Sequence, residues 1–382
     1  MKKPTIEKTV FISDVQSNSK TQSKIYGRYF NESKIFNVFP PELKDRGDLL
    51  GIILPTNSIP NKSKLCGVIA DDGINFYSYG KRIRSEIYSL YQNIFSRNKG
   101  ILESDVMAQK RAIILGCGSV GSLVALELAR AGVKNYILVD ADIVEYHNIC
   151  RHQCGIEDVG DYKVYALKRK ILNINPSANI ITFEGIVQNL PKETLDSFCD
   201  AGNTIFVGCA DNRMADVYTN RISIYYKSSF ISIGFWERAF AGEIFYHLYG
   251  KNMPCYECAL GDGSKLSVRA EANHHVYSNQ EETEGIKFEP GISVDINFVT
   301  SIGIKLILDI LNINNDGYIP RLLNGLTQYT LVCNTSNAEI GGEMVDIFSY
   351  PLQVTTSLKV GFSKKCGDKC KYEKKQEINK GD

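Results

Sequence analysis

The chain has 382 residues, of which 43% are hydrophobic and 23% are charged, so it can bury one large core, or a large core and a smaller one. It has 44 Lys and Arg residues against 43 Asp and Glu, and a net charge of +1 excludes an overall field that would hold it on nucleic acid or a membrane. No apolar secretory segment follows Met1, and its 11 cysteines suggest a reducing compartment. We therefore expect a cytoplasmic protein without a nucleic-acid or membrane partner.

Residues 1–95 have the pattern of a small α+β module of unknown role. Apolar runs at 49–54 and 65–70 precede Asp71-Asp72-Gly73, and residues 74–79 then alternate between apolar and polar. This pattern is typical of a β-hairpin with an Asp-Gly turn. Apolar residues at helical spacing from 83 to 95 predict a helix that leads into the next domain.

Residues 96–370 alternate between short apolar runs and helical patterns. We expect strands at 112–115, 136–139, 180–183, 205–207 and 230–233, and helices at 123–130, 163–172 and 213–226. This order predicts an α/β fold with a mostly parallel sheet, a Rossmann-like nucleotide-binding domain. Residues 261–291 are polar and aperiodic, which predicts a long loop, and residues 371–382 form a charged tail.

A glycine-rich segment follows the first expected strand of this domain. Gly116, Gly118 and Gly121 fit the pattern G-x-G-x-x-G, which allows a tight turn and a close approach of the backbone to phosphate at a helix N-terminus. Asp140 ends the next expected strand, where a carboxylate can bind ribose hydroxyls. An NAD-dependent dehydrogenase would share these features, so they predict a nucleotide without identifying it.

The polar residues after Asp140 favour a triphosphate. The segment contains Asp142, Asn148 and Arg151, and Lys163 follows. Arg151 and Lys163 would neutralise the β- and γ-phosphates while Asn148 orients them. Any one of these residues alone could be a solvated loop residue, but a dehydrogenase has no need for the whole set. The sequence therefore favours ATP over NAD.

The stretch from Arg111 to Asn212 resembles the ThiF/MoeB family of adenylyltransferases, which are related to ubiquitin-activating enzymes. The matching motifs are D-x-D-x-V-x-x-x-N-x-x-R-x-Q from Asp140, V-G-x-x-K ending at Lys163, and Cys209-Ala210-Asp211-Asn212-Arg213. One departure is His152, which separates Arg151 from Gln153 where many members have Arg and Gln adjacent.

The resemblance implies an enzyme that joins a carboxylate to the α-phosphate of ATP and releases pyrophosphate. Asp140 would bind the ribose, and Asn148, Arg151 and Lys163 would hold the phosphates. Asp211 would carry Mg²⁺, a metal that prefers carboxylate, water and phosphate oxygens. The family's nucleotide site also includes the positions of Gly116, Gly118, Gly121, Asp142 and Asn212.

An arginine upstream of the domain reaches into the neighbouring subunit's ATP site in this family. Arg97, in Ser96-Arg97-Asn98, resembles that arginine and would act as an arginine finger in a homodimer. Arg28 is a weaker candidate, and a surface arginine without a catalytic role stays an alternative for both. The apolar segment 298–311 would lie at or behind the interface between the subunits.

Two close pairs of cysteines predict a structural zinc site. Cys255 and Cys258 form one pair, and Cys366 and Cys370, with one extra residue between them, form the other. Four thiolates make a closed tetrahedral site. A redox pair and unliganded thiols stay open as alternatives, and Cys333 is a substitute ligand.

Relatives that transfer sulfur or ubiquitin use a nucleophilic cysteine, often on the loop after the first cysteine pair. This chain has no cysteine between Cys258 and Cys333, which favours an enzyme that adenylates its substrate and passes the product on. The main hypothesis is activation of the C-terminal carboxylate of a ubiquitin-like or sulfur-carrier protein. The alternatives are a peptide adenylyltransferase of the microcin-maturation type, a tRNA-modifying cyclase and an inactive binding scaffold.

Overall fold

The computed structural model describes residues 7–210, 212–260, 290–356 and 358–363, together with Cys366 and Cys370. The chain divides into an N-terminal unit, Met1–Lys99 together with the short segment Leu172–Ser177, and a larger unit that contains the rest of the chain from Gly100. Most of the predicted loop at 261–291 and the whole tail at 371–382 lie outside the described residues.

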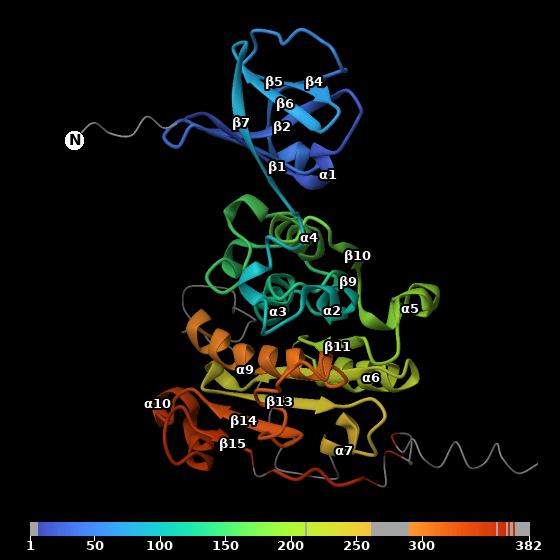
Figure 1. Ribbon diagram of the computed structural model, residues 1–382. Coiled ribbons are helices and arrows are strands. Elements are labelled where there is room, and N and C mark those ends of the chain that lie inside the picture. The colour runs from blue at the N-terminus through green and yellow to red at the C-terminus, as the bar shows by residue number, and fades with distance from the viewer. Residues whose placement is uncertain are drawn as a thin grey trace, which may run out of the picture. The chain divides into compact units, whose positions relative to one another are not determined.

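The N-terminal unit is built of strands (Figure 1). They form a closed barrel with the order β1-β3-β2-β4-β5-β6-β7. Its strands are β1 (Thr9–Ser13), β2 (Ser23–Phe30), β3 (Ile35–Val38), β4 (Asp48–Leu54), β5 (Leu65–Ala70), β6 (Gly73–Ser78) and β7 (Lys81–Tyr88). One short helix, α1 (Asp14–Ser17), follows β1. Alternate residues along the strands, such as Val10, Ile12 and Phe76, point inward and form the core of the barrel.

The predicted hairpin is confirmed, because β5 and β6 pair antiparallel around Asp71 and Asp72. The helix predicted for residues 83–95 is wrong. Residues 81–88 form β7, which pairs with β6 on one side and with β1 on the other and so closes the barrel. Ile83 and Ile87 are four residues apart, a spacing that fits a helix face and one face of a strand equally well.

The larger unit contains an eight-stranded sheet with the order β10-β9-β8-β11-β12-β13-β14-β15. The first five strands in this order are parallel, and they confirm the predicted α/β fold with a mostly parallel sheet. They are β8 (Arg111–Leu115), β9 (Asn135–Asp140), β10 (Asn179–Glu184), β11 (Thr204–Gly208) and β12 (Ser229–Phe235). The antiparallel strands are β13 (Ala241–His247), β14 (Tyr329–Cys333) and β15 (Val354–Thr355).

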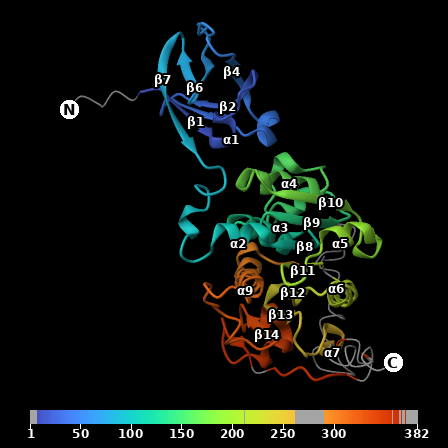
Figure 2. The same ribbon diagram turned by 45° about the vertical axis from the view of Figure 1, so that its right-hand side comes forward.

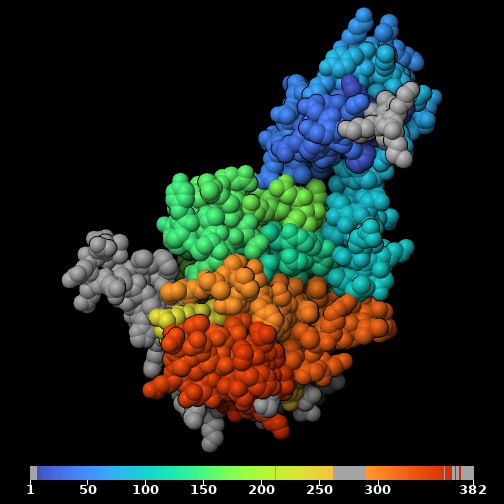
Figure 3. Space-filling view, turned by 90° about the vertical axis from the view of Figure 1, so that its left-hand side faces the viewer, coloured from blue at the N-terminus to red at the C-terminus, as the bar shows by residue number. Residues whose placement is uncertain are grey.

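Helices connect and cover these strands. They are α2 (Ser104–Gln109), α3 (Ser119–Arg130), α4 (Lys163–Ile174), α5 (Lys192–Phe198), α6 (Arg213–Tyr225), α7 (Tyr256–Leu260), α9 (Ser293–Leu311) and α10 (Ala338–Gly341). Helix α9 packs against α3 (Figure 2), and in Figure 3 it lies beside the C-terminal segments, coloured orange to red, on one face of the unit. Within the described residues, no helix has the length and apolar character needed to cross a membrane.

The order of the parallel strands reverses at one point of the sheet, where α/β sheets commonly bind ligands. From β8 the chain moves outward to β9 and β10, then returns to the other side of β8 to form β11 and β12. In sheets of this kind the loops after the two strands at the reversal diverge and leave a crevice at their carboxyl ends. The glycine-rich segment follows β8 directly, and the Cys209-Ala210 segment follows β11.

Candidate nucleotide-binding site

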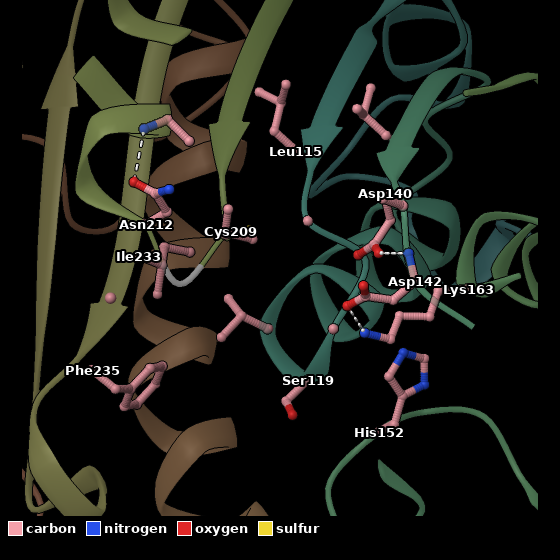
Figure 4. Close-up of a pocket in the computed structure, with 18 of the residues that line it drawn as sticks. Leu115, Ser119, Asp140, Asp142, His152, Lys163, Cys209, Asn212, Ile233 and Phe235 are labelled. Carbon is pink, nitrogen blue, oxygen red and sulfur yellow. Dashed lines mark hydrogen bonds and ion pairs between the residues drawn. The ribbon is translucent and has the colours of Figure 1, made fainter. Parts of the chain in front are cut away.

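A pocket of about 680 Å³ opens at the carboxyl ends of the parallel strands (Figure 4). It gathers residues that are far apart in the sequence but were predicted to share one site. These are Gly116, Gly118, Asp140, Asp142, Asn148, Arg151, Lys163 and Asn212. Asp211, the predicted magnesium ligand, lies outside the described residues.

Close packing requires glycine at two positions after β8, Gly116 in the loop and Gly121 in the first turn of α3. Gly116 has a φ of +91°, and a Cβ there would lie 2.8 Å from the backbone of Cys209. A Cβ on Gly121 would lie 1.9 Å from the carbonyl oxygen of Gly116. Gly118 differs, because nothing lies within 4 Å of its Cβ position, and α3 begins at the next residue. The open space at the N-terminus of a twelve-residue helix is suited to a phosphate group.

The Asp140 carboxylate is part of the scaffold of this loop. One of its oxygens accepts a hydrogen bond from the backbone N–H of Cys117 at 2.6 Å, and the other accepts from the N–H of Asp142 at 2.8 Å. Since a carboxylate has about four acceptor positions, it can still accept ribose hydroxyls. Sequence reasoning predicted the ribose contact and missed the contact with Cys117.

Lys163 lies at the start of α4, where its ammonium group contacts the Asp142 carboxylate at 2.7 Å. Its side chain is 11% exposed, whereas that of Asp142 is 70% exposed. The side-chain oxygen of Asn148 accepts a hydrogen bond from the backbone N–H of Glu145 at 2.9 Å, and Asn148 also lines the pocket. Arg151 also lines the pocket, so all three predicted phosphate-binding residues belong to its lining.

Asn212 caps the helix that begins beside the pocket. Its side-chain oxygen accepts hydrogen bonds from the backbone N–H groups of Met214 at 2.9 Å and Ala215 at 3.3 Å, at the start of α6. The structure thus gives Asn212 a structural contact and also places it in the lining of the pocket.

A buried carboxylate behind the pocket was missed by sequence reasoning. Glu243, on β13, is 3% exposed and accepts hydrogen bonds from the Arg213 guanidinium at 3.2 Å, the Trp236 indole at 2.9 Å and the Tyr329 hydroxyl at 2.7 Å. Trp236 lines the pocket, and Arg213 follows Asn212 in the chain. Glu243 therefore ties the first turn of α6 to the wall at the end of β12.

The predicted arginine fingers lie outside this set. Arg97 is exposed in a short 3₁₀ helix (Ser96–Asn98), and Arg28 is exposed on β2. Both arginines belong to the N-terminal unit, and a catalytic role for either stays a prediction.

The four predicted zinc ligands lie together, away from the pocket. The sulfurs of Cys255, Cys258, Cys366 and Cys370 lie within 4.8 Å of one another, and all four residues are buried. Four of the sulfur–sulfur distances run from 3.3 to 3.9 Å. A tetrahedron with Zn–S bonds of about 2.3 Å has edges of about 3.8 Å, so the cluster fits a zinc ion despite the extra residue in the second pair. Cys333, the predicted substitute, lies on β14 and does not belong to the cluster.

Comparison with known families and proteins agrees with this geometry. Residues 93–342 match the model of the ThiF family. The chain is 33% identical over 121 residues to a tRNA threonylcarbamoyladenosine dehydratase of Bacillus subtilis, covering 31% of the chain and 46% of that protein. It is 26% identical over 191 residues to adenylyltransferase and sulfurtransferase UBA4 of Meyerozyma guilliermondii, covering 50% and 42%. It is 30% identical over 158 residues to ubiquitin-like modifier-activating enzyme 5 of Arabidopsis thaliana, covering 38% and 36%.

The chain thus spans less than half the length of these curated relatives. Among solved structures it is similar to the microcin C7 biosynthetic enzyme MccB in complex with N-formylated MccA, with a TM-score of 0.50, 18% identity and coverage of 72% of the chain and 75% of that chain. At this identity the likeness shows the fold alone. Because the family model covers well over half of the sequence, the chain belongs to the ThiF family.

Proposed function

We propose that the protein uses ATP and Mg²⁺ to convert the C-terminal carboxylate of a ubiquitin-like or sulfur-carrier protein into an acyl-adenylate. The observation that carries the proposal is the pocket itself, in which an open helix N-terminus lies beside Asp140, Arg151 and Lys163. An anion site flanked by a carboxylate and two cations suits a nucleoside triphosphate better than a dinucleotide.

Different residues of the pocket would bind different parts of the nucleotide. Gly116 and Gly118 would bring the backbone N–H groups at the start of α3 against the α-phosphate, while Asp140 accepts hydrogen bonds from the ribose. Lys163 and Arg151 would neutralise the negative charge on the β- and γ-phosphates. Mg²⁺, held by Asp211, would supply further neutralisation of the leaving group.

The reaction requires little covalent work from the protein. A carboxylate oxygen attacks the α-phosphorus, a phosphorus–oxygen bond forms, and the bond to pyrophosphate breaks. Lys163 and Arg151 would stabilise the charge that builds on the departing pyrophosphate, which is the main contribution that fixed cations can make to phosphoryl and nucleotidyl transfer.

Two further parts of the proposal lie outside the pocket. The cluster of four buried cysteines would hold a structural zinc ion, because it offers no open ligand position. The protein would act as a homodimer in which Arg97 completes the partner's site, as the resemblance to the family implies.

A second candidate function is the adenylylation of a short peptide. The feature that favours it is the N-terminal barrel, which is a compact unit of its own and could hold a peptide.

The two functions are distinguished by ATP–pyrophosphate exchange, measured with small proteins that end in Gly-Gly and with short peptides encoded beside this gene. Exchange that depends on a Gly-Gly protein supports the first function, and exchange that depends only on a peptide supports the second. No exchange with either substrate contradicts both.

A further inference from the structure

His152 occupies a buried position between two loops of the nucleotide pocket. It is 7% exposed and lines the pocket (Figure 4). Its Nε2 lies 2.6 Å from the carbonyl oxygen of Cys117, and its Nδ1 lies 3.0 Å from the backbone nitrogen of Cys154. The ring therefore connects the glycine loop before α3 with the loop that carries Arg151.

These two contacts define the protonation state of the ring. The N–H of Cys154 can only donate, so Nδ1 must accept and carries no proton. The carbonyl of Cys117 can only accept, so Nε2 must carry the proton. The neutral Nε2–H tautomer satisfies both contacts, whereas a second proton, on Nδ1, would face the N–H of Cys154.

The same segment of the glycine loop is held from its other side. The N–H of Cys117 donates to Asp140, so the two peptide groups that flank this residue are fixed by two different side chains. The next residues are Gly118 and Ser119, where α3 begins and where the N–H groups are free to face a phosphate. The direction of those N–H groups therefore depends on both Asp140 and His152.

We propose that His152, as the neutral Nε2–H tautomer, is a positioning residue that holds the glycine loop in the shape that binds the phosphates of ATP, and that ATP binding weakens when the ring takes up a second proton. This proposal rests on the proposed use of ATP. His152 occupies the position that separates Arg151 from Gln153, so the departure from the family pattern acquires a structural role here.

The burial of the His152 ring and the charged groups around it set the pH at which the ring takes up a second proton. Burial lowers the pKa of His152 below its usual 6.5, and Lys163 acts in the same direction, while the Cys117 carbonyl, Asp140 and Asp158 oppose them. The neighbouring thiols of Cys117 and Cys154 stay neutral because burial raises their pKa. With the folded pKa below the unfolded one, the ring is neutral at pH 7, and ATP affinity is lost only as the pH falls below 6.5.

Calorimetric titration of the full chain with Mg²⁺ and a non-hydrolysable methylene analogue of ATP tests the proposal between about pH 8 and about pH 5.5. His152→Gln keeps a donor and an acceptor but has no titrating group, so it should bind the analogue at pH 7 almost as tightly as the unaltered protein and weaken less on acidification. His152→Phe loses both hydrogen bonds and should bind roughly 10- to 100-fold more weakly at pH 7. His147→Gln changes an exposed histidine of the same loop and should retain the original pH profile.

Comparing His152→Gln with the unaltered protein removes the effect of the analogue's own phosphate titration, which both share. A second readout is the ¹⁵N NMR spectrum of the histidine side chains, which should show His152 protonated at Nε2 alone at pH 7. Thermal melting shows whether His152→Phe is folded. If it is not folded, the proposal is tested by the pH dependence of binding to His152→Gln and by the NMR spectrum.

Three results would overturn the role of His152: the Phe variant folded and binding normally, the Gln variant retaining the full pH dependence, or a proton on Nδ1 at neutral pH. Each of these leaves the proposed function intact as long as the unaltered protein binds the analogue. A protein that does not bind the analogue at any pH contradicts both proposals.

Discussion

The ammonium group of Lys163 lies 2.7 Å from the carboxylate of Asp142, and the two ends of this ion pair differ sharply in exposure, with 11% for the lysine side chain and 70% for the aspartate. Because the Lys163 side chain is mostly buried, few water molecules can solvate its ammonium group. The ion pair with Asp142 therefore fixes the position of this ammonium group at the pocket. An incoming polyphosphate would compete for Lys163, and the exposed Asp142 could then turn to solvent.

We therefore predict that Lys163→Ala lowers the rate of ATP–pyrophosphate exchange roughly 10²- to 10³-fold, as expected for the loss of a charge that stabilises the transition state. Asp142→Asn should change the rate by much less, because an ion pair with one well-exposed partner contributes at most about 1 kcal/mol. Lys168→Ala, on the same helix but outside the pocket lining, is the matched control. Equal losses for Lys163→Ala and Lys168→Ala would exclude a specific role for Lys163.

Glu243 should be among the residues most important for stability. Glu243→Ala leaves the Arg213 guanidinium, whose side chain is 9% exposed, without its carboxylate, and a broken buried pair typically costs about 3–5 kcal/mol. The free energy of unfolding, measured in urea, should fall by that amount. Arg221→Ala breaks the more exposed pair with Glu257 and should cost about 1 kcal/mol or less. Similar losses of unfolding free energy for Glu243→Ala and Arg221→Ala would mean that the buried contacts of Glu243 contribute no more to stability than an exposed ion pair.

Much of the sheet and of the pocket could be predicted because the relevant signals are local. Each parallel strand is a short apolar run, and the G-x-G-x-x-G and D-x-D motifs follow strands directly, so their side chains meet where the strands end. The contacts that support the pocket could not be predicted in this way. His152 and Cys117 are 35 residues apart, Arg213 and Glu243 are 30 apart, and Tyr329 and Glu243 are 86 apart. No periodic pattern relates such residues before the fold brings them together.

The turn between β12 and β13 carries backbone strain that a substitution can relieve. Arg238 and Ala239 have φ values of +51° and +54°, which L-residues with a Cβ adopt at a cost. Ala239→Gly removes this strain but also a buried methyl group, so it should destabilise the protein by about 1 kcal/mol less than Ala241→Gly, which has no strain to remove. Ala241→Gly, in β13 itself, removes a buried methyl group from an extended residue and should destabilise the protein. If both variants are destabilised alike, the positive φ at Ala239 carries no net strain.

Removal of zinc should destabilise the larger unit. Because the four cysteines come from two segments more than 100 residues apart, binding a metal there contributes to folding free energy, and chelation should lower the melting temperature. Cys255→Ser and Cys366→Ser should have similar effects, whereas Cys150→Ser, at an exposed position, should have little. Protein purified without chelator should contain about one equivalent of zinc, as expected for one Cys₄ site. Less than half an equivalent by elemental analysis, or loss of stability from only one of the two pairs, would count against the site.

The exposed position of Arg97 allows a test of catalysis between subunits. If Arg97 acts in the partner's site, Arg97→Ala and Asp211→Ala should each be inactive as homodimers, yet a mixture should regain activity, because a heterodimer has one site with both residues intact. An arginine finger typically contributes about 10³- to 10⁵-fold in rate, so even partial recovery would stand above the background. Sizing and affinity capture of differently tagged chains should confirm that subunits have exchanged. Arg28→Ala, mixed with Asp211→Ala in the same way, tests the weaker candidate. Exchange of subunits without recovered activity would mean that Arg97 acts within its own subunit or has no catalytic role.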